Sequence, residues 1–310
     1  MKIINRFADT LRRFFDGDVW YSFKRSKITV IATIITIIMM LAALFAPQIS
    51  PQNPFDPASL DLMDASTPPF WYEEGTTKFL LGTDDQGRDI LSAILYGSRI
   101  SLFVGFASIL LGMIIGVTLG LIAGYLGGAV DAFIMRCADV QISFPAILVA
   151  LLIDGVARGI MPKDRHEELA IYVLVLAIGF SNWVRFARTV RGSTMVEKNK
   201  EYVKAARVIG RHPAAIMFQH VLPNVMGPVL VIATIGLAIA ILTEATLSFL
   251  GVGVPPTEPS LGTLIRIGQS FLFAGEWWIV IFPGVFLATL VLAVNLLGDW
   301  LRDALNPKLR

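Results

Sequence analysis

The sequence predicts an all-α, polytopic membrane protein with six transmembrane helices, and three observations support this prediction. Hydrophobic residues make up 55% of the 310 residues and the mean hydropathy is +0.67, both above the usage of ordinary soluble domains. Six apolar stretches are long enough to cross about 30 Å of hydrocarbon as helices of about 20 residues. Lysine and arginine gather in segments that connect or flank these stretches, as they do in the cytoplasmic loops of membrane proteins.

The six apolar stretches are expected to be the membrane spans, and they lie near residues 28–46, 100–124, 132–153, 169–190, 224–250 and 279–298. A soluble protein with six buried helices is the alternative, but soluble core helices are amphipathic and usually shorter. The first stretch follows a basic region, as the core of a secretory signal does. It is longer than a usual signal core and Pro47 follows it directly, so we expect a retained anchor.

The distribution of basic residues predicts the orientation in the membrane. Segments 1–27, 185–223 and 300–310 together hold 18 of the 26 lysines and arginines. Segment 47–98 holds eight acidic residues and only two basic ones, Lys78 and Arg88. We therefore expect both termini and the 185–223 segment in the cytoplasm, and the 47–98 segment outside. The net charge of +2 is explained by this topology and does not indicate a nucleic-acid partner.

The chain outside the spans divides into an N-terminal segment and an external loop. Residues 1–15 place apolar and basic side chains on different faces, which is typical of a helix lying on the anionic inner leaflet, so we expect segment 1–27 to contact membrane lipid; a frayed basic tail is the alternative. Within segment 47–97, the proline- and acid-rich residues 47–78 predict an extended loop without a core. Apolar residues at 90, 91, 94 and 95 then predict a short surface helix that leads into the second span.

Four glycines recur at intervals of four in the second span, at Gly112, Gly116, Gly120 and Gly124. Small residues on one face let helix backbones approach closely in lipid, so we expect a close-packed helix there. Charged residues within spans are candidates for functional roles. Arg136 and Asp139 have the spacing of a local ion pair. Glu244 is isolated in the fifth span, where a role on a translocation path and a hydrogen-bonded structural role both remain open.

The sequence lacks the patterns of the common catalytic and metal sites. There is no G-x-x-x-x-G-K-[ST] stretch, which indicates that the chain does not itself hold nucleotide phosphates. The three histidines have no zinc spacing, and no serine sits in G-x-S-x-G. The single cysteine, Cys137, lies inside the third span and cannot form an intramolecular disulfide. We therefore expect no catalytic residue, metal site or cofactor in this chain.

A basic, alanine-rich passage interrupts the apolar sequence at residues 201–224, "EYVKAARVIGRHPAAIMFQHVLPN". Tyr202, Ala205, Ala206 and Ile209 are expected to share one face of a first helix. Gly210 can end this helix in a left-handed conformation, and Pro213 fits the first turn of a second helix. We expect two short helices with a sharp bend, closed by Leu222 and Pro223 before the fifth span begins.

This passage resembles the conserved loop of permease subunits in bacterial binding-protein-dependent ABC importers. The family pattern is E-A-A, three residues, G, nine residues, I, one residue, L-P. Ala205, Ala206, Gly210, Leu222 and Pro223 stand at matching positions, whereas Lys204 replaces the glutamate and His220 the isoleucine. The stretches "LGTDDQGRDILSAILYGSRISLFVG", "LSFLGVGVPPTEPSLG" and "NLLGDWLRDALNPKLR" are similar to the C-type subunit of dipeptide and oligopeptide permeases.

The resemblance implies a type I ABC importer transmembrane domain over residues 98–299, preceded by an appended first helix and external loop and followed by a short cytoplasmic tail, 300–310. It implies a path through the bacterial inner membrane for di- or oligopeptides, formed with a homologous permease. Two cytoplasmic ATPases, which use ATP and magnesium, would bind the loops at about 191–223, and a periplasmic binding protein would deliver the solute. The implied docking residues are Tyr202, Lys204, Ala205, Ala206, Gly210, Leu222 and Pro223.

Other functions remain open on the sequence alone. Nickel, glutathione and some sugar permeases resemble the same branch. A self-contained secondary carrier or channel would be favoured by broken, charged helices in two repeated halves, which the sequence does not display. A membrane scaffold that recruits ATPases without moving a solute is a third class.

Overall fold

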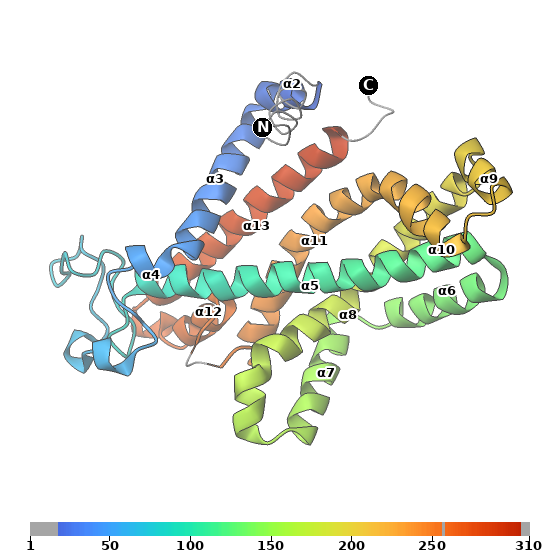
Figure 1. The fold of residues 1–310 in the computed structure, drawn as a ribbon. Coiled ribbons are helices and arrows are strands. Elements are labelled where there is room, and N and C mark those ends of the chain that lie inside the picture. The colour runs from blue at the N-terminus through green and yellow to red at the C-terminus, as the bar shows by residue number, and fades with distance from the viewer. Residues whose placement is uncertain (1–17, 256–257, 305–310) are drawn as a thin grey trace, which may run out of the picture.

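The computed structural model describes residues 18–255 and 258–304, and this part of the chain is helical without a named strand (Figure 1). The expected amphipathic segment at residues 1–15 lies outside the described residues. The helices longer than one turn are α2 (Asp18–Arg25), α3 (Lys27–Leu44), α5 (Ile90–Leu126), α6 (Gly128–Ile142), α7 (Ala146–Ile160), α8 (Lys163–Glu197), α9 (Glu201–Val208), α11 (Leu222–Phe249), α12 (Leu261–Gln269) and α13 (Trp278–Ala304). The shorter turns are α4 (Ala46–Ile49), η1 (Pro57–Ser59), η2 (Leu62–Asp64), α10 (Pro213–Ile216), η3 (Met217–Val221) and η4 (Leu272–Ala274).

Five helical stretches within the described residues are long and apolar enough to cross a membrane, and α6 with α7 form a sixth candidate as a bent pair. The expected all-helical organisation is therefore confirmed, with five candidate spans, or six if the bent pair counts as one, and three details of how the spans are built differ from the prediction. These details concern the helix that leads into the second span, the third span and the start of the fifth span.

The second span is one continuous helix, α5, rather than a surface helix followed by a span. Asp89 caps its N-terminus, where Asp89 Oδ2 accepts a hydrogen bond from Ser92 N at 2.8 Å. No proline interrupts the 37 residues that follow, and Gly127 with φ +70° ends the helix. At about 1.5 Å per residue the helix is longer than the hydrocarbon core is thick.

The third span is broken, with α6 and α7 meeting at 90°. Proline has no amide hydrogen to donate and disfavours helical geometry in the residue before it. Pro145 therefore ends α6 after Ile142 and starts α7 at Ala146. The prediction of a single helix over 132–153 was wrong because it followed hydropathy and gave this proline too little weight.

The fifth span begins earlier than expected, because α10 continues through η3 into α11. Pro223 cannot donate a hydrogen bond four residues back, and η3 is a π-helical turn in which Leu222 N donates to Met217 O, five residues earlier. Leu222 and Pro223 thus begin α11 instead of closing a separate helix. Single π turns of this kind occur frequently at functional sites.

The core of the bundle is the contact between α5 and α8, which pack together along most of their length. α11 lies against both helices, and α13 packs on α11 and carries α3 on its other side. α2 contacts the C-terminal part of α13, where the rings of Phe23 and Trp300 meet edge to face at 5.2 Å. Figure 1 shows α5 running the length of the molecule, with α4 near one end and α9 and α10 near the other.

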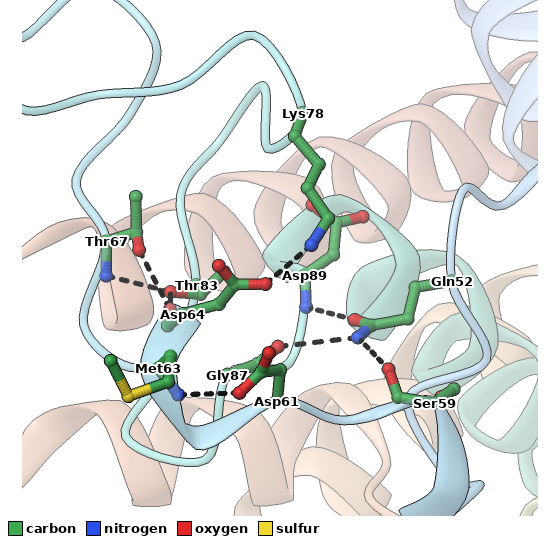
Figure 2. Close-up of polar contacts among 10 residues, drawn as sticks. All are labelled: Gln52, Ser59, Asp61, Met63, Asp64, Thr67, Lys78, Thr83, Gly87 and Asp89. Carbon is green, nitrogen blue, oxygen red and sulfur yellow. Dashed lines mark hydrogen bonds and ion pairs between the residues drawn. The ribbon is translucent and has the colours of Figure 1, made fainter.

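Residues 50–89, named the insert here, are folded rather than extended. Figure 2 shows the side chain of Gln52 linking its two ends: Nε2 donates to Ser59 O at 2.8 Å, and Oε1 accepts from Asp89 N at 2.8 Å. In the same view Lys78 Nζ donates to Asp64 Oδ2 at 2.5 Å. These contacts join the first and last residues of the insert and hold it at the start of α5.

The insert also has a small buried centre, formed by residues 79–88, which follow the stretch 47–78 for which a loop without a core is expected. Phe79 is 2% exposed, and Asp84 and Arg88 form a buried ion pair at 2.7 Å. Trp278 Nε1 at the start of α13 donates to Thr83 O at 3.0 Å. The centre forms because the insert packs against the start of α13, which is distant in the sequence. Local composition does not contain such a long-range contact.

Candidate functional site

The candidate site is the passage between α8 and α11, residues 198–223, named the elbow here. It lies at the opposite end of α5 from the insert (Figure 1). Gly210 has φ +80°, as the sequence predicts, and Arg211 N donates to Ala206 O at 3.1 Å across the turn. The sharp bend between α9 and α10 therefore depends on a backbone conformation that glycine adopts without strain.

The predicted docking residues do not all lie on one face of the elbow. Ala206 is 7% exposed and Val203 is fully buried, so this face of α9 packs on the rest of the chain. Tyr202, Lys204 and Ala205 are exposed. Of the four residues expected to share a face, Tyr202, Ala205 and Ile209 are exposed, whereas the helix turns Ala206 inward, so the expectation was wrong for Ala206.

The outward surface of the elbow carries large apolar side chains that are not among the predicted docking residues. Val208 is 88% exposed, Ile209 79% and Phe218 55%. Val208 and Ile209 stand directly before the left-handed Gly210, and η3 turns Phe218 outward. Exposed apolar side chains gathered at a bend are typical of a surface that a partner covers. Leu222 is half-buried and Pro223 is exposed beside them.

The elbow is tied to the helix bundle by polar contacts that the sequence did not predict. Lys198 Nζ donates to Gly124 O at 2.7 Å, at the C-terminal end of α5, where a cation is favoured by the helix dipole. The guanidinium of Arg207 lies over the ring of Tyr125 at 5.1 Å. Both contacts connect the elbow to the C-terminal end of α5.

A second link runs through Tyr202 and joins α8, α9 and α11. Its hydroxyl donates to Glu197 Oε2 at 2.5 Å and accepts from Asn224 Nδ2 at 3.2 Å. Partial burial, together with the hydrogen bond to Glu197, raises the pKa of Tyr202 to about 12. The hydroxyl therefore stays protonated at neutral pH and keeps donating to Glu197.

Ion pairs also connect α6 to α8 near the elbow. Arg191 Nε and Nη2 donate to the two carboxylate oxygens of Asp131 at 2.5 and 2.6 Å. Arg188 Nη2 donates to Asp139 Oδ1 at 2.6 Å. The expected ion pair between Arg136 and Asp139 is corrected accordingly, because the bundle brings an arginine of α8 to Asp139.

The four glycines of the second span line the contact between α5 and α8. A Cβ atom added at Gly116 would lie 2.5 Å from Phe186 Cβ and would also clash with Trp183 O. At Gly112 it would lie 2.9 Å from Gly179 O, and at Gly124 2.7 Å from Thr194 Cβ. Gly120 would meet Ala187 O in the same way. All four glycines thus lie where the two backbones are closest.

Glu244 is fully buried between α5, α11 and α12. Ser101 Oγ donates to Glu244 Oε2 at 2.6 Å, and Ser248 Oγ donates to Oε1 at 2.8 Å. Leu261 N donates to Ser101 Oγ at 3.3 Å, which adds the start of α12 to the network. Of the two roles left open by the sequence, the structure favours the hydrogen-bonded structural one.

The bundle of membrane-spanning helices with a projecting elbow has the fold of a type I ABC importer transmembrane domain. A chain of the inward-facing MetNI methionine ABC transporter superposes with a TM-score of 0.52 at 20% identity, covering 67% of this chain and 93% of that one. This similarity concerns the fold alone.

No group of three or more potential metal ligands occurs among the described residues.

Family comparisons place the chain more narrowly. The family described as binding-protein-dependent transport system inner membrane component matches residues 116–310, and the N-terminal transmembrane domain of oligopeptide transport permease C matches residues 14–69. The chain therefore belongs to the binding-protein-dependent ABC importer permeases, in the branch of the C-type permeases.

Named relatives support this assignment over most of the chain. The dipeptide transport system permease protein DppC of Haemophilus influenzae is 41% identical over 94% of this chain and 95% of its own length. The oligopeptide transport system permease protein OppC of Bacillus subtilis is 36% identical over 94% of this chain and 90% of its own.

Proposed function

We propose that this chain forms, together with a homologous permease, the path by which a bacterial importer moves di- or oligopeptides through the inner membrane. The elbow, residues 198–223, binds a cytoplasmic ATPase, and a periplasmic binding protein delivers the peptide at the end of the bundle that carries the insert. ATP and magnesium are used by the ATPases. The substrate class rests on the DppC and OppC relatives.

The observation that carries the proposal is the exposed apolar surface of the elbow. Val208, Ile209 and Phe218 project at the bend, whereas Lys198 and Arg207 hold the same segment against α5. A partner that closes on this surface pulls on α5 and α8 through those contacts. The elbow then acts as a lever between ATP-driven motion outside the membrane and the helices that line the path.

The orientation proposed for the chain follows from its basic residues, which favour the cytoplasmic side. Lys200, Lys204, Arg207 and Arg211 lie in the elbow, and the acidic insert lies at the opposite end. Both termini and the elbow are therefore assigned to the cytoplasm.

The homologous permease is proposed to contact the broken third span. An apolar groove of about 610 Å³ is lined by residues of α5, α6, α7 and α8. Phe133 and Phe144 line it and are 71% and 59% exposed. Close packing of a second permease on this groove would bury both rings.

Uptake by the reconstituted importer tests the proposal. Proteoliposomes containing this chain, its partner permease, both ATPases and the binding protein should accumulate labelled di- and tripeptides only when ATP is supplied. Ile209→Asp should reduce both ATPase co-purification and uptake by at least about tenfold, because it places a charge in a desolvated contact. Phe273→Asp is the matched control, since Phe273 is 97% exposed at the opposite end and should leave ATPase binding unchanged.

Three results would contradict parts of the proposal. Peptide uptake without ATP would indicate a secondary carrier. Transport of nickel or glutathione but not of peptides would overturn the substrate class. Normal ATPase binding by Ile209→Asp and by Val208→Asp would refute the docking role of the elbow.

A further inference from the structure

A pocket of about 380 Å³ opens at the end of the bundle where the insert joins α5. Four separate segments of the chain line it. α5 contributes Tyr96, Arg99, Ile100 and Phe103, the insert contributes Phe55, α8 contributes Ile171, and the loop between α11 and α12 contributes Glu258. The volume lies within the range of small-molecule sites, at about 300–1,000 Å³.

The buried residues of α5 show which face of this helix is turned toward the pocket. Ser98 and Ser101 are fully buried, and Ser101 is held by Glu244. Each residue of an α-helix turns the side-chain direction by about 100°, so Arg99 points away from the two serines. Tyr96, Arg99, Ile100 and Phe103 have the spacing of a single helix face, and this face lines the pocket.

The two charged side chains of the pocket have opposite signs and do not bind each other. Arg99 and Glu258 are both exposed, and the ion pairs of the described residues do not include either of them. An arginine on a membrane-spanning helix is costly unless it faces water or an anionic group. The pocket therefore holds an unpaired cation and an unpaired anion on different walls, with aromatic and apolar surface between them.

Contacts between neighbouring segments hold the walls of the pocket in place. The rings of Phe55 and Tyr96 meet edge to face with their centroids 5.2 Å apart. The loop that carries Glu258 lies close to α5, because a Cβ added at Gly97 would meet Pro259 O at 3.1 Å. Glu258 N also donates a hydrogen bond to Pro255 O at 3.1 Å. The walls are thus held together by contacts other than an ion pair between the two charges.

We infer that this pocket is a peptide-binding subsite of the permease, in which Arg99 binds the terminal carboxylate and Glu258 the terminal ammonium of a short peptide. A ligand that satisfies both walls must be a zwitterion with its charges separated. In a dipeptide the two terminal charges lie at opposite ends of a chain at most about 7 Å long, and its side chains are free to contact the aromatic surface. The inference rests on the proposed function, since it names where the transported peptide first contacts this chain.

A zwitterionic phospholipid headgroup has the same pair of charges, an anionic phosphate and an ammonium. The peptide is favoured because a free carboxylate matches the planar arginine fork in two parallel hydrogen bonds. The apolar side chains of a peptide also suit the ring surface of Phe55, Tyr96 and Phe103. The test below separates the two sources.

The test uses the complex of this chain with its partner permease and ATPases in nanodiscs, without the binding protein. The probe is a dipeptide with free termini and a photoreactive side chain. Cross-links should map to residues 96–103 of this chain, and unlabelled dipeptide should compete for them. The C-terminal amide and the N-acetyl form should each compete about tenfold less well, because each removes one charge-assisted hydrogen bond.

Two variants should remove this discrimination selectively. In Arg99→Gln the dipeptide and its amide should compete equally, while the N-acetyl form should remain about tenfold weaker. In Glu258→Gln the pattern should be reversed. Arg302→Gln and Glu73→Gln are the matched controls, since both residues are exposed elsewhere, and they should retain both differences. A loss of fold would abolish cross-linking altogether rather than one difference alone.

The inference is overturned if cross-links fall outside the pocket, if no cross-link is competed by dipeptide, or if both variants keep both differences. It is also overturned if phosphatidylethanolamine in the nanodisc, but not dipeptide, displaces the probe. Uptake of the same dipeptide by the complete wild-type importer separates this failure from failure of the proposed function. If the importer takes up the dipeptide but both variants keep both differences in competition, only the subsite is refuted. If the wild-type importer takes up no dipeptide, the proposed peptide importer is refuted.

Discussion

Replacing Gly116 by alanine tests whether the contact between α5 and α8 depends on the absence of a side chain. A Cβ at this position would lie 2.5 Å from Phe186 Cβ, whereas ordinary contacts begin near 3.4 Å. The two helices must therefore separate by about 0.9 Å at this level. The added Cβ would also clash with the backbone oxygen of Trp183. Because this atom belongs to the backbone, a change of side-chain rotamer cannot relieve the clash.

The cost follows from two opposing effects. A gap of 0.5–1 Å forfeits roughly a quarter to a half of the dispersion attraction between the atoms that it separates, and overpacking typically costs about 1–3 kcal/mol. Alanine favours a helix over glycine by about 1 kcal/mol, which offsets part of this loss. We expect Gly116→Ala to lower the free energy of unfolding by up to about 2 kcal/mol relative to wild type, whereas a glycine-to-alanine change without a clash should raise it.

The measurement is the thermal stability of the purified complex in nanodiscs, followed by the loss of monodisperse protein in size-exclusion chromatography. Gly284→Ala is the control, because no atom lies within 4 Å of a Cβ added there. The control should be as stable as wild type or more stable. If Gly116→Ala and Gly284→Ala were equally stable, the glycine stripe would not hold the two helices together.

Three further changes have expected outcomes. Glu244→Leu removes the acceptor of the Ser101 and Ser248 hydroxyls and should lower the free energy of unfolding by about 1–2 kcal/mol. Glu244→Gln keeps an acceptor and should lower the free energy of unfolding by less. Lys198→Ala removes the contact with the C-terminal carbonyls of α5 and should increase amide hydrogen exchange in the elbow while exchange in α3 stays unchanged; equal exchange would refute the anchoring role. Burial raises the pKa of Asp89 above its ordinary value of 3.8, so the folded insert favours the protonated carboxyl. The stabilisation of the insert by Asp89 is therefore fully present below pH 3.8 and is lost as the pH rises through the pKa of the folded state. Hydrogen-exchange protection in the insert, corrected for intrinsic rates, should fall over this range in wild type but not in Asp89→Asn.

Local features of the sequence were sufficient to predict most of the helices and the bend of the elbow. Gly210 could be predicted because only its own backbone conformation is involved. The same holds for Pro213, which starts α10. The broken third span could also have been predicted, since Pro145 is a local signal to which the hydropathy pattern gave too little weight.

Other features depended on residues that are distant in the sequence. Asp139 binds Arg188 rather than the nearby Arg136, because α6 and α8 are brought together by the bundle. Ala206 faces inward and Ile209 outward, although helical spacing alone allowed both to share a face. The partners of a charge and the exposed side of a short helix are set by neighbouring helices, so a one-dimensional pattern does not contain them.

Hydropathy, charge distribution and single glycine or proline residues therefore determined the number of spans, their expected orientation and the position of the elbow. These properties depend on the transfer of each segment into lipid and on backbone angles, which are local quantities. The tertiary structure alone decided that the insert has a buried centre, that Glu244 is enclosed by serines, and that Arg99 and Glu258 line one pocket. Each of these depends on which surfaces of distant helices meet, and packing of the whole chain selects that arrangement.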